Sequence, residues 1–321
     1  MTAGLVYVSD AEPGIMRRRC GRGFTYVAPD GTTIARGRER KRIQALAVPP
    51  AYEDVWICPK ANGHLQATGR DARARKQYRY HPDWTATQAA TKFDMLPRFA
   101  EALPKIRRRV ARDLDDDPGD ETFALAAAVT MIDRAALRVG HEEYTRENGT
   151  YGALTLKRRH LCMGDDGITL RFTAKGGTKV RKTLGDKKLQ KLLGKIHDVP
   201  GATLLSWVDD AGQGHSLCSR QLNSYLADAA GLEEITAKAF RTWAGTVAAF
   251  ECAEQGDATI KDVSTAAARR LHNTPTVARN SYIHPAVIDL CGGPVTTPAP
   301  VRKSGLYAAE QRLLGLLTDL A

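Results

Sequence analysis

The sequence lacks the motifs of the commonest enzyme classes. Its eight histidines show no His-Glu-x-x-His or paired metal-ligand spacing, and there is neither a Walker phosphate-binding loop nor a Gly-x-Ser-x-Gly elbow. Its six cysteines are scattered and include no Cys-x-x-Cys pair. These absences argue against zinc hydrolases, P-loop nucleotide hydrolases and elbow-type serine hydrolases. They also predict reduced thiols rather than a disulfide framework.

Long apolar segments are missing as well. The longest mostly apolar run, residues 123–132, is far too short to span a bilayer. No basic region precedes an apolar stretch at the N-terminus, so we expect no secretory signal. With 43% hydrophobic and 26% charged residues, the chain of 321 residues has an ordinary soluble composition. We therefore expect a cytoplasmic protein that does not bind membranes.

Positive charge is what the chain has in excess. It contains 47 Lys and Arg against 36 Asp and Glu, a net charge of +11, and residues 1–80 hold 15 cations against 7 acids. Most of these cations are arginines, whose planar guanidinium groups match phosphate geometry. Such clustering is typical of nucleic-acid binders. A solvated basic face and an anionic lipid surface remain alternatives, although no amphipathic anchor helix accompanies the charge.

The first 84 residues predict a small β-rich domain. Short β-like stretches at 23–28, 55–59 and 64–68 are separated by Gly, Pro and Asp, and no long helical period appears. Residues 69–80 then interleave cations with aromatic side chains. Alternation along a strand places Tyr78 and Tyr80 on one face. There they could lie against sugar or base edges beside phosphate-binding arginines.

Residues 85–321 predict a larger, mainly helical domain, so the expected fold class is α+β. The periodicity predicts helices at 85–94, 96–114, 120–138, 186–196, 217–229, 236–254, 258–270 and 275–284. A linker rich in Pro, Gly and Thr at 292–300 leads to a predicted amphipathic helix within 305–321. This last helix could pack on the core or on a partner, and its role stays open.

Between these helices the hydrophobic period changes to two. Residues 154–163, 168–175 and 178–184 predict a three-stranded meander, with hairpin turns at Asp166-Gly167 and Gly176-Gly177. The second turn places Lys175 at a hairpin tip. Lysines at such tips are usually only solubilising, so this position is weak evidence by itself.

Residues 271–282, near the C-terminus, carry the strongest local signal. Thr274 and Pro275 are typical of a helix N-cap and of the first helical position. Tyr282 then lies about two turns into a short helix. A tyrosine held in this way can be a nucleophile if cations elsewhere stabilise the charge that its attack creates. For this segment alone, a half-buried packing tyrosine is the simpler interpretation.

Four motifs resemble the type IB DNA topoisomerases, above all their compact poxvirus-like and bacterial branch. The motifs are residues 137–156, the Lys175 hairpin, Lys-x-x-Arg at 238–241 and Thr-Pro-x-Val-x-Arg-x-x-Tyr at 274–282. The resemblance extends from about residue 24 to residue 282. Each motif is weak alone, but four in register are specific. It implies an N-terminal DNA clamp and a catalytic domain of the kind shared with tyrosine recombinases.

The resemblance implies a catalytic role for each matched residue. Tyr282 would be the nucleophile, and Arg138, Lys175 and Arg241 would be its catalytic partners.

One departure concerns the neighbours of the Thr-Pro motif. Asn273, not His272, aligns with a histidine that many members use in catalysis, and an offset of one residue turns a helical side chain by about 100°. An asparagine amide can still donate to a phosphate oxygen. We therefore assign this role to Asn273 and expect His272 to be structural, although a contribution of His272 to catalysis stays open.

The resemblance also points to DNA contacts in both domains. Positions matched to DNA-contacting residues of the family are Gln77, Tyr78, Tyr80 and Tyr144, and the neighbouring Arg75, Lys76, Arg79 and Asn148 complete the set that we expect to bind DNA.

These residue types suit transesterification. The pKa of a free phenol is about 10, so flanking cations must lower the cost of forming phenolate. Guanidinium and amide donors suit the charge that develops on the nonbridging phosphate oxygens. Lys175 is the titratable cation that could protonate the leaving 5′-oxygen.

We accordingly expect relaxation of supercoiled double-stranded DNA through a 3′-phosphotyrosyl link that the 5′-hydroxyl reseals. We expect no ATP, metal or other cofactor. The expected form is a monomer clamped around DNA and associated with the nucleoid.

Two alternatives accompany this interpretation. A tyrosine recombinase would usually show His-x-x-Arg at the second arginine, whereas this chain has Lys238 three residues before Arg241. A DNA-binding protein of the same fold without activity is a further alternative, and the complete residue set argues against it. Cleavage-site preference and activity on RNA stay open.

Overall fold

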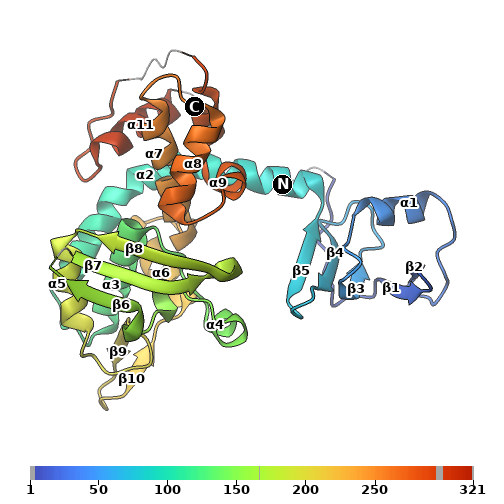
Figure 1. Ribbon diagram of the computed structural model, residues 1–321, viewed down its shortest axis with the longest axis horizontal. Helices are drawn as coiled ribbons and strands as arrows, with labels where there is room; N and C mark the ends of the chain where they lie inside the picture. Colours follow the sequence, from blue (N-terminus) through green and yellow to red (C-terminus); the bar gives the residue numbers. More distant parts are fainter. Residues whose placement is uncertain (1–3, 166, 294–298, 320–321) are drawn as a thin grey trace. The chain divides into compact units, whose positions relative to one another are not determined.

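The computed structural model describes residues 4–165, 167–293 and 299–319 (Figure 1). The chain divides into two compact units, Met1–Lys92 and Phe93–Ala321. The division lies inside a long helix, α2 (Pro82–Asp113), whereas the domain boundary was expected after residue 84. A β-rich first unit and a mainly helical second unit confirm the α+β class.

The first unit is built on one antiparallel sheet in the strand order β2-β1-β3-β4-β5. Its elements are β1 (Ile15–Cys20), β2 (Gly23–Val27), α1 (Arg38–Ala45), β3 (Glu53–Ile57), β4 (Leu65–Arg70) and β5 (Lys76–Tyr80). The sheet packs a small core that includes Ile15, Val55 and Ile57. Helix α1 was not predicted, because Ile43 is its one buried residue and so it has no apolar period.

The second unit is mainly helical. Its helices are α3 (Glu121–Ala135), α4 (Glu142–Asn148), α5 (Lys187–Ile196), α6 (Ser219–Ala230), α7 (Ala237–Ala253), α8 (Ile260–Leu271), α9 (Pro275–Tyr282), α10 (Pro285–Asp289) and α11 (Ala308–Thr318), together with the greater part of α2. The short helices α4 and α10 were not predicted.

The prediction of separate helices at 85–94 and 96–114 is wrong, because α2 continues through Pro97 and Pro104. Interior prolines each remove one backbone hydrogen bond. Here a continuous buried face that includes Leu96, Phe99 and Leu103 offsets that cost.

The meander forms a three-stranded sheet in the order β6-β7-β8, made of β6 (Leu161–Gly164), β7 (Gly167–Ala174) and β8 (Thr178–Leu184). The prediction of a strand over 154–160 is wrong, because two short 3₁₀ turns occupy most of this segment. Leu154 and Leu156 are buried, and their backbone bonds go to Val139 and Leu204 rather than to a strand. Of the first predicted turn, Asp166 lies outside the described residues. A short hairpin, β9 (Ser206–Val208) and β10 (Gly214–Ser216), completes the unit.

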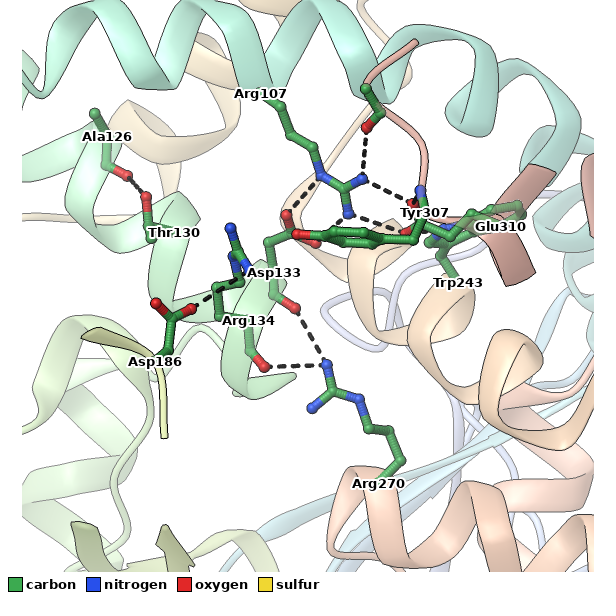
Figure 2. A network of polar contacts seen from close by, with 11 residues as sticks. Arg107, Ala126, Thr130, Asp133, Arg134, Asp186, Trp243, Arg270, Tyr307 and Glu310 are labelled. Carbon is green, nitrogen blue, oxygen red and sulfur yellow. Dashed lines mark hydrogen bonds and ion pairs between the residues drawn. The ribbon is translucent and has the colours of Figure 1, made fainter. Parts of the chain in front are cut away.

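The C-terminal helix α11 packs back on the second unit through buried charges. Figure 2 shows Arg107 of α2 between the carboxylates of Asp133 and Glu310, at 2.9 and 2.8 Å. The indole of Trp243 also donates to Glu310, at 3.0 Å. This helix therefore packs on the core of the second unit. The leucines spaced for one face of the predicted amphipathic helix are Leu313, Leu314, Leu317 and Leu320. The first three are buried, and Leu320 lies outside the described residues.

The described residues contain neither a candidate membrane span nor a candidate metal-binding cluster. None of their helices is long and apolar enough to cross a membrane. No group of three or more His, Cys, Asp and Glu side chains among them is arranged to hold a metal ion.

Candidate active site and nucleic-acid interface

Tyr282 is the last residue of α9, and the predicted cap of this helix is present. The Thr274 hydroxyl accepts a hydrogen bond from the Val277 amide at 3.3 Å, and Pro275 occupies the first turn. The predicted end at residue 284 is slightly too late. Residue 284 precedes a proline, which disfavours helical geometry.

Helix α7 holds the backbone around Tyr282. The Thr246 hydroxyl donates to the Tyr282 carbonyl at 3.1 Å and accepts from the His284 amide at 3.2 Å. A Cβ atom at Gly245 would lie 2.9 Å from the Tyr282 carbonyl oxygen, so only glycine allows this approach. The sequence interpretation missed both α7 residues. A glycine inside a strong helical period was the signal that could have identified them.

Arg241 is buried on α7, beneath the nucleophile candidate. Its guanidinium donates to the carbonyls of Ala136 and, at 3.1 Å, Leu271, while Nε has no partner among the described residues. Its Cζ lies 5.3 Å from the ring centroid of Tyr282. Burial lowers the pKa of Arg241 to about 10, the charge of Arg138 acts in the same direction, and the Tyr282 phenol opposes both. Arg241 therefore stays charged at neutral pH.

Arg138 follows α3 rather than lying in its last turn, so this part of the prediction is wrong. Helix α3 ends at Ala135, because Ala136 takes the left-handed conformation. The Arg138 carbonyl then accepts from the Ala153 amide at 2.8 Å. A Cβ at Gly152 would lie 2.5 Å from this carbonyl oxygen, so the two backbone segments can approach only at a glycine. Arg138 is thus placed by backbone packing.

Asn273 pairs directly with Arg138. Its side-chain Oδ1 accepts from the Arg138 guanidinium, and its Nδ2 is buried with no acceptor in the described chain. His272, the preceding residue, caps α8 in the left-handed conformation with a φ of 50°. It lines a small hollow together with Arg138 and Arg241. Burial lowers the pKa of His272, and the nearby cations add to that effect, so its imidazole is neutral at neutral pH.

Lys175 lies at the predicted hairpin tip, between β7 and β8. It is exposed, and no hydrogen bond or ion pair joins it to a residue that the structure describes. The tip residues Gly176 and Gly177 both have positive φ, at 82° and 79°, which the tight turn requires. The fold thus brings together Arg138, Arg241, Asn273 and Tyr282, and leaves Lys175 on a projecting loop.

Strand β5 of the first unit carries most of the residues expected to bind DNA. Tyr78 and Tyr80 lie on one face, as predicted, with ring centroids 6.1 Å apart and planes 9° from parallel. The ammonium of Lys76 lies 5.6 Å from the Tyr78 ring centroid. Both tyrosines are about half exposed, at 49% and 45%. This face offers aromatic rings beside a cation, and β5 is an edge strand of the sheet.

The cations beside these rings are paired with acids. Lys76 lies 2.5 Å from Asp10, and Arg75 lies 2.6 Å from Asp71. The hydrogen bond from Arg75 lowers the pKa of Asp71 to about 2. These pairs are surface contacts that a phosphate can replace.

Gln77 and Arg79 alternate with the tyrosines and bond within the first unit. Gln77 donates to Asp71 at 3.1 Å, and Arg79 donates to the Ala47 carbonyl at 3.4 Å. In the second unit, Tyr144 and Asn148 belong to α4, which has no buried residue. Tyr144 is 59% exposed. All these expected DNA contacts are thus on accessible elements.

Comparisons with known proteins identify the family of the chain. Residues 23–71 match the family model of the bacterial DNA topoisomerase IB N-terminal domain, and residues 81–280 match that of the eukaryotic DNA topoisomerase I catalytic core. The second match contains Arg138, Lys175 and Arg241 and ends just before Tyr282.

Curated relatives are also named as type IB DNA topoisomerases. The DNA topoisomerase 1B of Acanthamoeba polyphaga mimivirus is 27% identical over 293 residues, which cover 86% of this chain and 87% of the viral protein. The DNA topoisomerase 1B of Vaccinia virus (strain Copenhagen) is 27% identical over 124 residues, 39% of each chain. Because the catalytic-core match alone spans more than half of the sequence, the chain belongs to the DNA topoisomerase I family, as an enzyme of the type IB class.

Proposed function

We propose that this enzyme relaxes supercoiled DNA by transient cleavage of one strand, with Tyr282 as the nucleophile. The phenol oxygen forms a bond to the phosphorus while the bond from phosphorus to the 5′-oxygen breaks. The phenol proton leaves to solvent, and the 5′-oxygen takes a proton from Lys175. Attack of the 5′-hydroxyl on the phosphotyrosyl bond reverses each of these changes, so the energy of the phosphodiester is conserved.

The observation that carries the proposal is a pair of buried nitrogen donors without acceptors. Nε of Arg241 and Nδ2 of Asn273 have no hydrogen-bond partner among the residues described, although buried donors are nearly always paired. They belong to side chains that lie beside Tyr282 and Arg138. A phosphate between them would supply the missing acceptors and receive permanent positive charge.

The proton donor lies on the projecting hairpin. Lys175 is exposed and free to turn toward bound DNA, as an acid that must reach the leaving oxygen requires. Arginine is a poor proton donor because of its high pKa. We propose that the hairpin closes on DNA and that Lys175 then acts as the general acid.

We further propose that the protein acts as a monomer and needs no metal, ATP or other cofactor. Phosphate charge can be met by Arg138, Arg241 and Asn273 together, and the reaction conserves bond energy, so neither a metal nor a nucleotide has a necessary step. Double-stranded DNA would also contact the aromatic face of β5. A monomer should bind a short duplex with one protein per DNA molecule, and sedimentation of the complex measures this ratio.

The decisive experiment is relaxation of supercoiled plasmid with EDTA present and without ATP. We expect the wild-type protein to relax positive and negative supercoils alike. The Tyr282→Phe variant should bind the plasmid but not relax it. With a duplex labelled at the 5′ end of the cleaved strand, the label should become covalently attached to the wild-type protein only, since the link is to the 3′-phosphate.

Tyr307→Phe is a matched control, because the Tyr307 ring also lies beside a guanidinium, 4.6 Å from Cζ of Arg107. This variant should relax plasmid normally. Relaxation by Tyr282→Phe at the wild-type rate would contradict the nucleophile assignment. A requirement for Mg²⁺ would contradict the cofactor proposal, and joined plasmids would point to a recombinase.

A further inference from the structure

Lys182 connects two elements that carry candidate catalytic residues. It lies on β8, one strand of the hairpin with Lys175 at its tip. Its Nζ donates to the Arg270 carbonyl in the last turn of α8, at 3.0 Å. Over the described ranges, this is the one hydrogen bond that joins the three-stranded sheet to α8. Asn273 comes immediately after His272, the C-cap residue of that helix.

The surroundings of Lys182 are unfavourable for a cation. The side chain is half-buried, and no carboxylate among the described residues pairs with it. Burial lowers the pKa of Lys182 to about 7, and the charges of Arg270 and Arg241 act in the same direction. A lysine kept for stability alone would be expected to have an acidic partner. Burying this lysine without an acidic partner lowers the stability of the folded protein, which suggests that the residue is kept for a function.

The end of α8 receives cations from three directions. Lys182 of β8 donates to the Arg270 carbonyl, and Arg241 of α7 donates to the Leu271 carbonyl. Arg138, which follows α3, donates to Oδ1 of Asn273. Carbonyl groups at a helix C-terminus favour cations, because they are the negative end of the helix dipole. Two of these three cations are proposed to act on the phosphate directly. Lys182 is the third of these cations and is the one that belongs to the hairpin.

We propose that Lys182 is a positioning residue for DNA cleavage: its bond to the Arg270 carbonyl ties the Lys175 hairpin to the end of α8 that presents Asn273. The inference rests on the proposed function, since it concerns the placement of the acid relative to the phosphate donors. Without the tie, each element keeps its own fold, but the two are no longer held at one separation. Misplacement of a catalytic group by about 1 Å can cost up to about 100-fold in rate.

The test is Lys182→Met, which keeps the length and apolar stem but removes the donor and the charge. We expect single-turnover cleavage at saturating DNA to slow about tenfold, the loss that one hydrogen bond to a charged group would produce. DNA affinity should stay within about twofold. The midpoint of thermal unfolding should be unchanged or higher, because an uncompensated cation is removed. Lys182→Arg keeps a cationic donor and should cleave faster than Lys182→Met.

Lys191→Met, at an exposed position of α5, is the matched control and should behave as wild type. Cleavage by Lys182→Met at the wild-type rate would overturn the proposal. So would a fall in unfolding midpoint that accompanies the loss of rate, since Lys182 would then only hold the fold together. Equal rates for the Met and Arg variants would show that the donor has no role.

The wild-type arm separates this inference from the proposed function. If the wild-type protein forms no covalent adduct with DNA, the proposed function fails, whatever the variants do. If it forms the adduct and Lys182→Met matches it, the function stands and only the positioning role is lost.

Discussion

Two cations at the start of β5, Lys76 and the preceding Arg75, differ from the arginines around Tyr282 in what they bind. Both are paired with carboxylates, whereas Arg79 of the same strand donates to the Ala47 carbonyl. In the second unit, Arg241 binds backbone carbonyls and Arg138 binds an amide oxygen. A carboxylate neutralises its partner, whereas a neutral oxygen orients the guanidinium and leaves its charge uncompensated.

In the proposed function, this difference would separate DNA binding from catalysis. A surface cation can exchange an acidic partner for a phosphate at little net cost, which suits contacts made and broken along DNA. A buried cation held by neutral oxygens is already oriented before the phosphate arrives, and its charge is available in full. The second arrangement lowers the stability of the free protein, because buried like charges repel. The folded core of the second unit offsets that loss.

The largest expected effect is that of Arg241→Met. It removes the buried charge beside Tyr282, and loss of one donor of this kind typically slows a reaction about 100-fold to 1,000-fold. Single-turnover cleavage of a labelled duplex measures it. Arg269→Met, at an exposed position of the neighbouring helix α8, is the control and should leave the rate near that of wild type. If Arg241→Met slowed cleavage less than about threefold, the cations around Tyr282 could not be called catalytic, and the comparison would fail.

A smaller effect is expected for Asn273→Ala, and it should exceed that of His272→Ala. The asparagine variant loses the free Nδ2 donor and the partner that orients Arg138, so we expect cleavage to slow about 100-fold. The neutral imidazole of His272 adds no charge to the site, and its variant should slow cleavage less than about tenfold. Rates measured on the same duplex decide the order. The reverse order would assign the phosphate contact to His272.

The smallest effect is expected for Lys76→Ala on β5. Affinity for duplex DNA should fall a few-fold, and the slope of log affinity against log salt should become shallower by about 0.9, the value for one phosphate contact. Cleavage at saturating DNA should be unchanged. Lys191→Ala, on α5, serves as the control with an unaltered slope. A loss of cleavage rate without a change in slope would place Lys76 with the catalytic cations and end the distinction between the two regions.

Much of the helical unit was predictable from local patterns. Thr274 and Pro275 mark a helix start by capping chemistry that depends on adjacent residues alone, and the cap is present. The glycine pair after Lys175 likewise predicted its hairpin tip. The apolar alternation gave a wrong prediction where the apolar residues pack on the core from a segment that is not a strand. Leu154 and Leu156 alternate like a strand, yet they cover the core from 3₁₀ turns.

The candidate site was predictable as a set of residues but not as an arrangement. Order and spacing of the motifs pointed to Arg138, Arg241 and Tyr282, because a resemblance requires only the linear sequence. The backbone path that places Arg138 was not predictable, since it depends on contact with Gly152 across the fold. The role of Thr246 in holding Tyr282 depends equally on a neighbour distant in sequence.

The sequence by itself determined the chemistry available to this protein: an excess of cations, a capped helix ending in tyrosine, and a lysine at a hairpin tip. These follow from composition and from neighbours along the chain. Only the tertiary structure decided which cations remain uncompensated. Lys76 and Lys182 are the same residue type on two strands, yet one faces a carboxylate and the other a helix-end carbonyl. The degree to which the charge of a lysine is compensated depends on that partner, and packing between distant segments determines the partner.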